Sequence, residues 1–168
     1  FIFSTLLMAC NEDLNPSDKD QRSAVEGTVG HNVGQVAADF SIEDSQLNMI
    51  NLSDELAAND AVVLYFNMWC PLCDSHLSSM RKSVKPEFPN VQFLVIDYVS
   101  GSAKQSRRAQ LANGYASETV IPDVQQALLT QFEGTMGSTV VIAANGQVLM
   151  NEDYKQSKIT TVLNLASP

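Results

Sequence analysis

Positive charge is scarce in this sequence. Its 168 residues include 10 Lys and Arg against 19 Asp and Glu, which gives a formal net charge of −9 at pH 7. Because nucleic-acid binding needs basic surface against the phosphates, we expect no nucleic-acid partner. Hydrophobic residues nevertheless make up 45% of the chain, enough to bury a core. The sequence therefore predicts one folded domain with an appendage.

The N-terminal region lacks an initiator methionine and a basic segment, although it is apolar. Residues 1–9 are too few to cross a bilayer as a helix, and we interpret them as a signal-peptide remnant. Leu7-Met8-Ala9-Cys10 resembles a bacterial lipobox, in which the cysteine is lipidated and begins the mature protein. The alternatives are an ordinary signal peptide and a buried apolar arm. The lipobox implies a lipid-anchored protein of the bacterial cell envelope, on the periplasmic or another extracytoplasmic side, where disulfides persist.

Cysteine is also rare, with three in the chain. Apart from the lipobox cysteine, the other two form the motif Cys70-Pro71-Leu72-Cys73. The apolar run 61–69 before this motif predicts a buried strand, and the segment after it predicts a helix. The first turn of a helix has unpaired N–H groups and the positive end of the helix dipole, and both favour a thiolate. We therefore expect a reactive dithiol at a strand–helix junction.

The remaining pattern divides the chain into a tether and one domain. Residues 10–32 are polar and turn-rich, so we expect the lipidated Cys10 and a flexible tether there, followed by a domain over residues 33–168. Strands are expected over 38–42, 47–50, 61–67, 91–98, 119–121, 138–143 and 147–150, and helices over 53–58, 74–84, 103–113, 124–132 and 156–166. This order predicts the α/β class, with a central mixed sheet, helices on both faces and an N-terminal strand or hairpin extension.

Three segments resemble the thioredoxin superfamily, and more narrowly the bacterial membrane-anchored TlpA/ResA-type thiol–disulfide proteins and the related redoxins. The segments are Trp-Cys-Pro-Leu-Cys at 69–73, Ala-Asp-Phe at 38–40 and Leu-Ser-Asp-Glu-Leu at 52–56. The resemblance implies a thioredoxin-like three-layer sandwich. It also implies an enzyme, a thiol–disulfide oxidoreductase that exchanges electrons with exported protein thiols and disulfides, with a membrane electron donor as a further partner.

The resemblance assigns roles to the residues of the motif. Cys70 is the exposed nucleophile and Cys73 the resolving thiol, so the redox-active disulfide Cys70–Cys73 takes the place of a bound cofactor. Trp69 is expected to shield the thiols, and Pro71 suits the first helical turn because its missing N–H would be unpaired there. A permanent structural disulfide is the alternative, although so small a loop would constrain the unfolded chain little.

A buried acid that is frequent in thioredoxins is missing. It usually stands six residues before the first cysteine, where this chain has Leu64. The proton of Cys73 therefore needs another acceptor. The candidates are Asp74, Glu118, His76 and water.

A cis-proline of the thioredoxin pattern is missing as well. It usually precedes the strand before the terminal hairpin, but this chain has no proline between Asp123 and Ser157. The corresponding loop falls near Gly137 and Ser138. We expect these two residues to face the dithiol and to contact the substrate.

The spacing of the motif also leaves a metal site open. Cys70, Cys73 and His76 follow the pattern CxxCxxH, and two soft thiolates with an imidazole suit copper or zinc. A fourth ligand is not evident, although Met136 and Met68 could lie nearby. The alternative function is therefore a copper- or zinc-binding protein on a thioredoxin fold.

Three further functions are weighed against the dithiol enzyme. Covalent haem attachment is excluded because it needs a histidine directly after the second cysteine, where the chain has Asp74. A peroxiredoxin-like peroxidase shares the early elements, but its pattern has Pro and Thr ahead of the cysteine, where this chain has Met68-Trp69. An interaction protein without catalysis would show no thiol-dependent phenotype.

Overall fold

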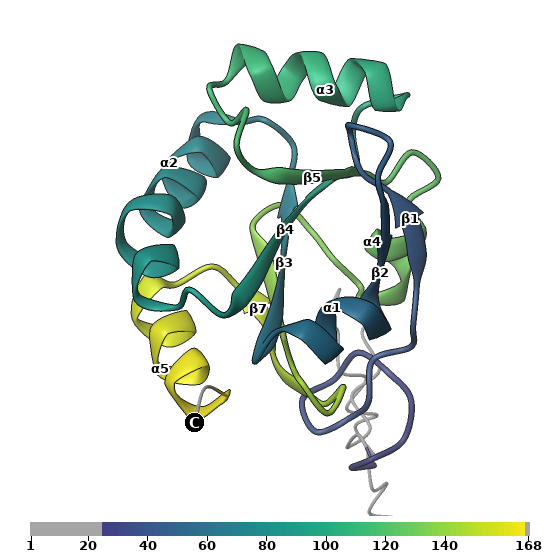
Figure 1. The fold of residues 1–168 in the computed structure, drawn as a ribbon, viewed down its shortest axis with the longest axis vertical. Coiled ribbons are helices and arrows are strands. Elements are labelled where there is room, and N and C mark those ends of the chain that lie inside the picture. The colour runs from purple at the N-terminus through teal and green to yellow at the C-terminus, as the bar shows by residue number, and fades with distance from the viewer. Residues whose placement is uncertain (1–24, 167–168) are drawn as a thin grey trace, which may run out of the picture.

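The computed structural model describes residues 25–166, which are built around a five-stranded mixed sheet (Figure 1). The strand order is β5-β4-β3-β6-β7. Strands β3, β4 and β5 are parallel, whereas β6 is antiparallel to both β3 and β7. The bounds of the strands are β3 (Ala61–Asn67), β4 (Val91–Asp97), β5 (Thr119–Pro122), β6 (Ser138–Ala143) and β7 (Val148–Asp153).

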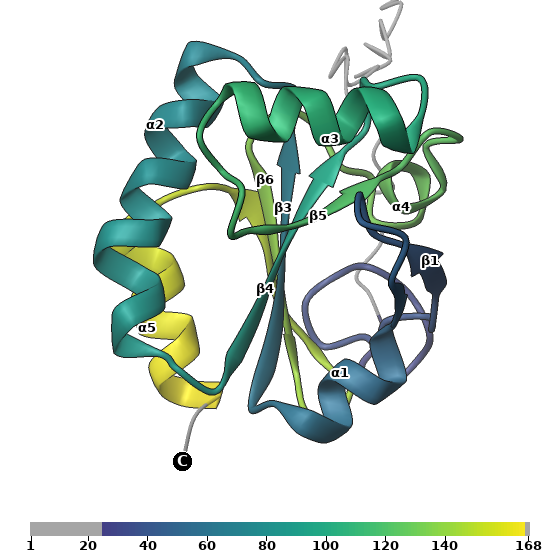
Figure 2. The same ribbon diagram turned by 45° about the horizontal axis from the view of Figure 1, so that its top comes forward.

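Helices cover both faces of this sheet. Figure 2 shows α2 and α5 on one face, with α1, α4 and the hairpin β1–β2 on the other. The bounds are α1 (Leu52–Ala58), α2 (Pro71–Ser79), α3 (Ala103–Ala112), α4 (Ala127–Gln131) and α5 (Gln156–Ala166); a π-helical turn (Met80–Val84) and a 3₁₀ turn (Lys85–Glu87) continue α2. The predicted three-layer α/β sandwich is confirmed.

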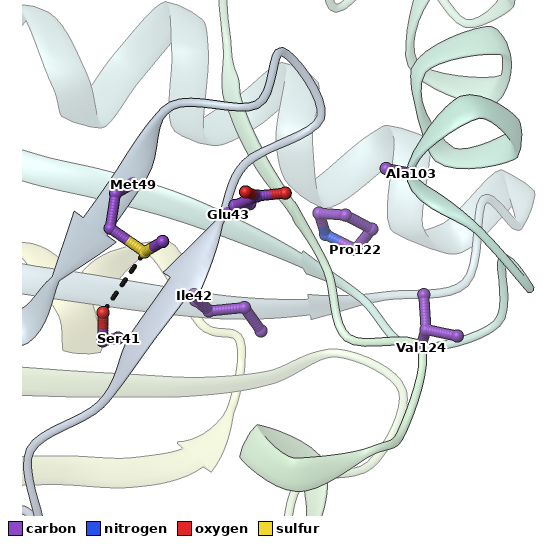
Figure 3. A pocket seen from close by; sticks show the side chains of 7 residues that line it. All are labelled: Ser41, Ile42, Glu43, Met49, Ala103, Pro122 and Val124. Atoms are coloured by element: carbon purple, nitrogen blue, oxygen red, sulfur yellow. Dashed lines mark hydrogen bonds between the residues drawn. The ribbon is translucent and has the colours of Figure 1, made fainter.

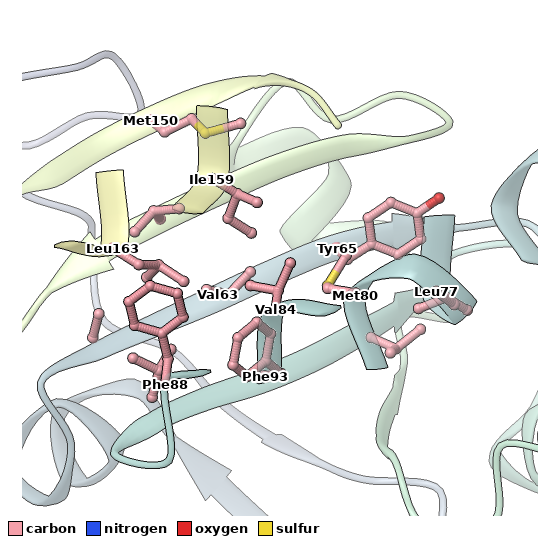
Figure 4. Packing of buried hydrophobic residues seen from close by; sticks show 14 of the residues in the cluster. Val63, Tyr65, Leu77, Met80, Val84, Phe88, Phe93, Met150, Ile159 and Leu163 are labelled. Atoms are coloured by element: carbon pink, nitrogen blue, oxygen red, sulfur yellow. The ribbon is translucent and has the colours of Figure 1, made fainter. Parts of the chain in front are cut away.

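Strand β3 divides the core into two clusters. All seven of its residues are buried, which explains its continuous apolar run, since both of its faces are covered. Val63 and Tyr65 belong to the cluster under α2 and α5, drawn in Figure 4. Leu64 and Phe66 belong to the cluster on the opposite face. Alternation along one strand therefore decides which side chains lie beneath the dithiol helix.

The predicted N-terminal extension is the antiparallel hairpin of β1 (Ser41–Glu43) and β2 (Met49–Asn51). Asp39 ties this extension to the domain, because its carboxylate Oδ1 accepts the backbone N–H of Phe40 at 2.9 Å and of Ser53 at 3.0 Å. Ser53 lies in the first turn of α1, whose N–H groups have no partner within the helix. The Ala-Asp-Phe segment thus helps to begin α1.

The folded chain begins before the predicted boundary at residue 33. Gly27 N–H donates to the carbonyl of Gly34 at 2.9 Å, and the carbonyl of His31 accepts the side-chain amide of Asn151 at 3.1 Å. Residues 25–32 therefore belong to the domain, and the turn-rich composition that predicted a tether instead forms turns packed beside β7. The rest of the predicted tether, with Cys10, lies outside the described residues.

The segment predicted as a helix over 124–132 is shorter than expected. Its helix, α4, begins at Ala127, because the chain first turns at Gln126, which has a positive φ of 55°. The buried carboxylate of Asp123 then accepts the N–H groups of Leu128 at 3.2 Å and Leu129 at 2.8 Å. Among residues 25–166, no helix has the length and apolar character needed to span a membrane.

Candidate active site

Cys70 stands at the start of α2, directly beyond the end of β3. It is the N-cap residue of the helix, with an extended backbone (φ −88°, ψ 162°), and Pro71 occupies the first turn. The N–H of Cys73 donates to Cys70 Sγ at 3.2 Å, and the N–H of Asp74 donates to the Cys70 carbonyl at 2.9 Å. A sulfur therefore occupies the place that a capping oxygen usually takes, where negative charge is stabilised.

The two thiols have different surroundings. Cys70 is partly exposed, whereas Cys73 is fully buried, and both are free in the structure. The hydrogen bond from the Cys73 side chain lowers the pKa of Cys70, and backbone N–H groups of the helix start lower it further. Burial raises the pKa of Cys73, and its hydrogen bond to Cys70 raises it again. An accessible thiolate beside a buried thiol is the pairing that the predicted roles require.

We expect alkylation of Cys70 by iodoacetamide to become half-maximal at a lower pH than alkylation of the cysteine in a short unstructured peptide. The pKa of Cys70 is lowered, and the thiolate is the reacting species. In a Cys73→Ala variant the side-chain donor is lost, so the midpoint should move to higher pH. Mass mapping of the Cys70 peptide across a pH series measures both midpoints. Equal midpoints in the two proteins would contradict the assigned cause.

The residue before the dithiol, Trp69, is held in an uncommon backbone conformation. Its φ is 58°, its N–H donates to Asn67 Oδ1 at 3.0 Å, and its indole Nε1–H donates to Asp97 Oδ2 at 2.8 Å. The other oxygen of the fully buried Asp97 accepts the N–H groups of Val99 at 3.2 Å and Ser100 at 3.1 Å. Asp97 thereby fastens the loop after β4 to the tryptophan beside the thiols.

Asp97 and Asn67 were not among the predicted site residues. They are partners in the parallel register of β3 and β4, and each ends a largely apolar strand. A polar residue at the carboxyl end of two neighbouring parallel strands is a signal that could have identified them. Trp69, which directly precedes Cys70, packs at the edge of the core near Tyr115, at 6.5 Å between ring centroids.

A tyrosine lies beside the buried thiol. The Tyr65 hydroxyl lies 3.0 Å from His76 Nδ1. Burial raises the pKa of Tyr65, and the neighbouring Cys73 thiol raises it further. Burial is also the largest cause of the lowered pKa of His76. Leu64, at the position where thioredoxins often have an acid, packs on the opposite face of the sheet. The phenol of Tyr65 therefore neighbours both Cys73 and His76, one of the predicted proton acceptors.

The two predicted carboxylate acceptors are occupied elsewhere. Asp74 Oδ1 accepts the hydroxyl of Tyr115 at 2.6 Å. Glu118 is nearly buried and pairs with Lys85 Nζ at 2.6 Å. Of the predicted acceptors among the side chains, His76 is thus the one that the described structure links to Cys73.

The loop without a proline lies beside Cys70, but its contact residue is Met136. Cys70 Sγ and Met136 Sδ are 3.4 Å apart. Gly137 uses its N–H to bind the carbonyl of Phe66 at 3.0 Å, and Ser138 uses its hydroxyl within the loop. The predicted loop position is therefore near the dithiol, while the polar groups predicted to contact substrate at Gly137 and Ser138 are engaged internally.

The ligand set proposed from the CxxCxxH spacing is not assembled. Within residues 25–166, no three His, Cys, Asp or Glu side chains come together as a metal-binding group. His76 shares α2 with the thiols, but its Nδ1 bonds Tyr65 and its ring packs on Tyr154 at 4.8 Å between centroids. The spacing placed the histidine on the correct helix and could not show that its ring is already held by two tyrosines.

A separate cavity of about 400 Å³ lies between the hairpin β1–β2, the end of β5 and the start of α3 (Figure 3). Its lining is made of small and apolar side chains together with one glutamate: Ser41, Ile42, Glu43, Met49, Ala103, Pro122 and Val124. None of these is a predicted site residue. The lining includes no cysteine, histidine or lysine, and the hydroxyl of Ser41 donates to Met49 Sδ at 3.2 Å.

Comparison with known families identifies the group to which this dithiol fold belongs. A family model described as the AhpC/TSA family matches residues 33–150, which is more than half of the chain. The chain belongs to the AhpC/TSA family. A search of curated proteins found no significant match. Family membership and fold together support a redoxin of the thioredoxin superfamily, as the sequence resemblance implied.

Solved structures show the same fold at low sequence identity. A protein from Chlorobium tepidum, provisionally named the thiol:disulfide interchange protein DsbE, aligns with a TM-score of 0.68, 18% identity and coverage of 80% of this chain and 97% of that one. The thioredoxin domain of a thiol-disulfide oxidoreductase from Bacteroides vulgatus aligns with a TM-score of 0.66 and 13% identity, and the alignment covers 81% of this chain and 99% of that one. MTB dsbF, in mixed oxidized and reduced forms, aligns with a TM-score of 0.62 and 17% identity, and the alignment covers 76% of this chain and 95% of that one. These similarities establish the fold of this AhpC/TSA member.

Proposed function

We propose that this protein is a thiol–disulfide oxidoreductase that exchanges electrons with exported protein thiols and disulfides through Cys70 and Cys73. The observation that carries the proposal is the asymmetry of the pair at the start of α2. Cys70 is accessible and its sulfur receives the Cys73 N–H at 3.2 Å, whereas Cys73 is fully buried. The redoxin family and the thioredoxin fold support the same chemistry.

The exchange proceeds in two displacements. The Cys70 thiolate attacks one sulfur of a partner disulfide, forming a mixed disulfide and releasing the other partner sulfur as a thiolate. Cys73 then loses its proton and attacks Cys70 Sγ, which releases the second partner thiolate. The partner is reduced by two electrons, the chain holds the Cys70–Cys73 disulfide, and another dithiol must return it to the reduced state.

The surface around Cys70 favours a polypeptide partner. Met68, Leu72 and Met136 are 40%, 50% and 38% exposed, which is unusual for three large apolar side chains near one reactive sulfur. Methionine is enriched at protein interfaces because its flexible side chain adapts to different partners. An extended segment of another protein could bury these side chains while its disulfide reaches Cys70.

We place the protein at the bacterial cell envelope through a lipid on Cys10. The support is the lipobox-like sequence Leu7-Met8-Ala9-Cys10, since export would expose the dithiol to disulfide-containing partners. Mass spectrometry of the N-terminal peptide from membrane-extracted protein tests this placement. A lipid-modified Cys10 at the N-terminus supports it, and an unmodified cysteine within a longer chain contradicts it.

The proposed function is tested by titrating the dithiol against glutathione redox buffers under anaerobic, metal-free conditions. The expected result is reversible formation of the Cys70–Cys73 disulfide as a single two-electron step. The midpoint potential also indicates the direction in which the protein transfers electrons. A potential near that of thioredoxin, about −270 mV, indicates a reductant, and one near that of DsbA, about −120 mV, indicates an oxidant.

A further inference from the structure

Three sulfur-bearing side chains come together at the start of α2, where Cys70 is partly exposed and Cys73 is buried. Cys70 and Cys73 lie one turn apart, and the N–H of Cys73 donates to Cys70 Sγ at 3.2 Å. The thioether of Met136, from the loop before β6, approaches Cys70 with 3.4 Å between Sδ and Sγ. That loop contains no proline, and Met136 is its residue in contact with Cys70. This cluster joins segments separated by 66 positions in sequence.

We infer that Cys70, Cys73 and Met136 form a binding site for copper(I). Thiolate and thioether sulfurs are soft ligands that favour Cu(I). Zinc usually takes four ligands in a structural site, and no His, Asp or Glu joins the pair among residues 25–166. The site therefore offers three soft donors and favours a low-coordinate monovalent ion over a tetrahedral divalent one.

The distances allow this ion to enter with small movements. Metal–sulfur bonds of about 2.3 Å in a trigonal arrangement place the sulfurs about 4 Å apart. The 3.4 Å between Cys70 Sγ and Met136 Sδ must therefore widen by about half an ångström. Met136 has three rotatable side-chain bonds and is 38% exposed, so its sulfur can move without disturbing the core.

Metal binding and disulfide exchange compete for the same sulfurs. Cu(I) needs both thiolates, so binding releases the thiol protons, and the Cys70–Cys73 disulfide has no thiolate left to donate. The reduced protein is thus the copper-binding form. When a disulfide-containing compound oxidises the dithiol and is itself reduced to two thiols, the ion is released. The inference does not depend on catalysis, because it requires the reduced cysteines and not the exchange reaction.

The test is an anaerobic titration of the fully reduced full-length protein with Cu(I) against bicinchoninate as a competing chromophoric chelator. One equivalent is expected to bind, with X-ray absorption showing sulfur neighbours alone. Met136→Leu keeps the volume of the side chain and removes the thioether, and it should weaken binding by about 10-fold or more, since even the loss of an outer contact of a metal site costs that much.

Two matched variants separate this site from its alternatives. Met68→Leu removes another exposed thioether near the motif and should leave the affinity unchanged. His76→Ala tests the CxxCxxH ligand set and should also leave it unchanged, because His76 Nδ1 is held by Tyr65. The inference would be overturned if the wild-type protein bound no copper, or if X-ray absorption showed nitrogen bound to the copper. It would also be overturned if Met136→Leu bound copper with wild-type affinity, or if only His76→Ala lost affinity. The metal-free glutathione titration reports independently on the redox function.

Discussion

A Cys73→Ala variant should accumulate a stable mixed disulfide with its protein substrate, and a Cys70→Ser variant should form none. Without the buried thiol, Cys70 still attacks a partner disulfide, but no sulfur remains within reach to resolve the product. Both variants should reduce insulin disulfides only at the background rate of the added dithiothreitol. Non-reducing gels with mass mapping measure the trapped species, and turbidity follows insulin reduction.

The third cysteine offers a matched control for this pair. Cys10→Ser removes the one cysteine outside the dithiol, and this variant should reduce insulin as the wild-type protein does and trap no partner. Full turnover by Cys70→Ser would contradict the assigned nucleophile. Wild-type turnover of hydrogen peroxide by Cys73→Ala, without reduction of insulin by the wild-type protein, would favour the peroxidase alternative instead.

An Asp97→Ala variant should lower the free energy of unfolding by about 3 kcal/mol, because three donors, from Trp69, Val99 and Ser100, lose a buried carboxylate. It should also change the fluorescence of Trp69, the single tryptophan of the chain. Urea unfolding followed by this fluorescence measures both effects. Asp97→Asn keeps one carbonyl oxygen as an acceptor and should show a smaller loss, which keeps the test useful if the alanine variant does not fold.

The control for Asp97 is an acid on the surface. Glu152 forms an exposed ion pair with Lys158 at 2.8 Å, so Glu152→Ala should change the free energy of unfolding by less than about 1 kcal/mol. Similar small losses in Asp97→Ala and Glu152→Ala would show that Trp69 and the loop after β4 do not depend on the buried carboxylate. An unchanged tryptophan spectrum in Asp97→Ala would contradict the assigned position of Trp69.

The sequence was sufficient for the features that depend on local pattern. The buried strand, the helix after it and the dithiol between them are neighbours along the chain, so apolar periodicity and helix-start chemistry predict them together. The alternation of strands and helices then predicts the α/β sandwich, since few topologies accommodate that order. Pro71 in the first turn of α2 follows from the same local reasoning.

The contacts that complete the site depend on segments far apart in sequence. Asp97 meets Trp69 through the register of β3 and β4, and Met136 meets Cys70 through the position of the loop before β6. A single sequence does not specify such register. His76 shows the limit most clearly. Its helical spacing suggested a ligand, while in the fold its Nδ1 bonds Tyr65 from the strand beneath and its ring packs on Tyr154.

Local composition was misleading at the start of the domain. The polar, turn-rich composition predicted a tether. In the structure, however, backbone groups of residues 25–32 are hydrogen-bonded within tight turns and to Asn151 of β7. Leu64, at the position of the expected acid, packs on the face of the sheet away from α2. The position of Tyr65 beneath α2 could not be predicted, because it depends on which face of β3 the helix covers.

The most direct test of the account is the glutathione titration of the wild-type protein, with each point acid-quenched and its cysteines mapped by mass spectrometry. The account predicts one reversible two-electron transition in which Cys70 and Cys73 lose two hydrogen atoms and become joined, while the Trp69 fluorescence changes with the same midpoint. Oxidation that stops at a glutathione adduct or a sulfenic acid on Cys70, with Cys73 remaining a free thiol throughout, would contradict it.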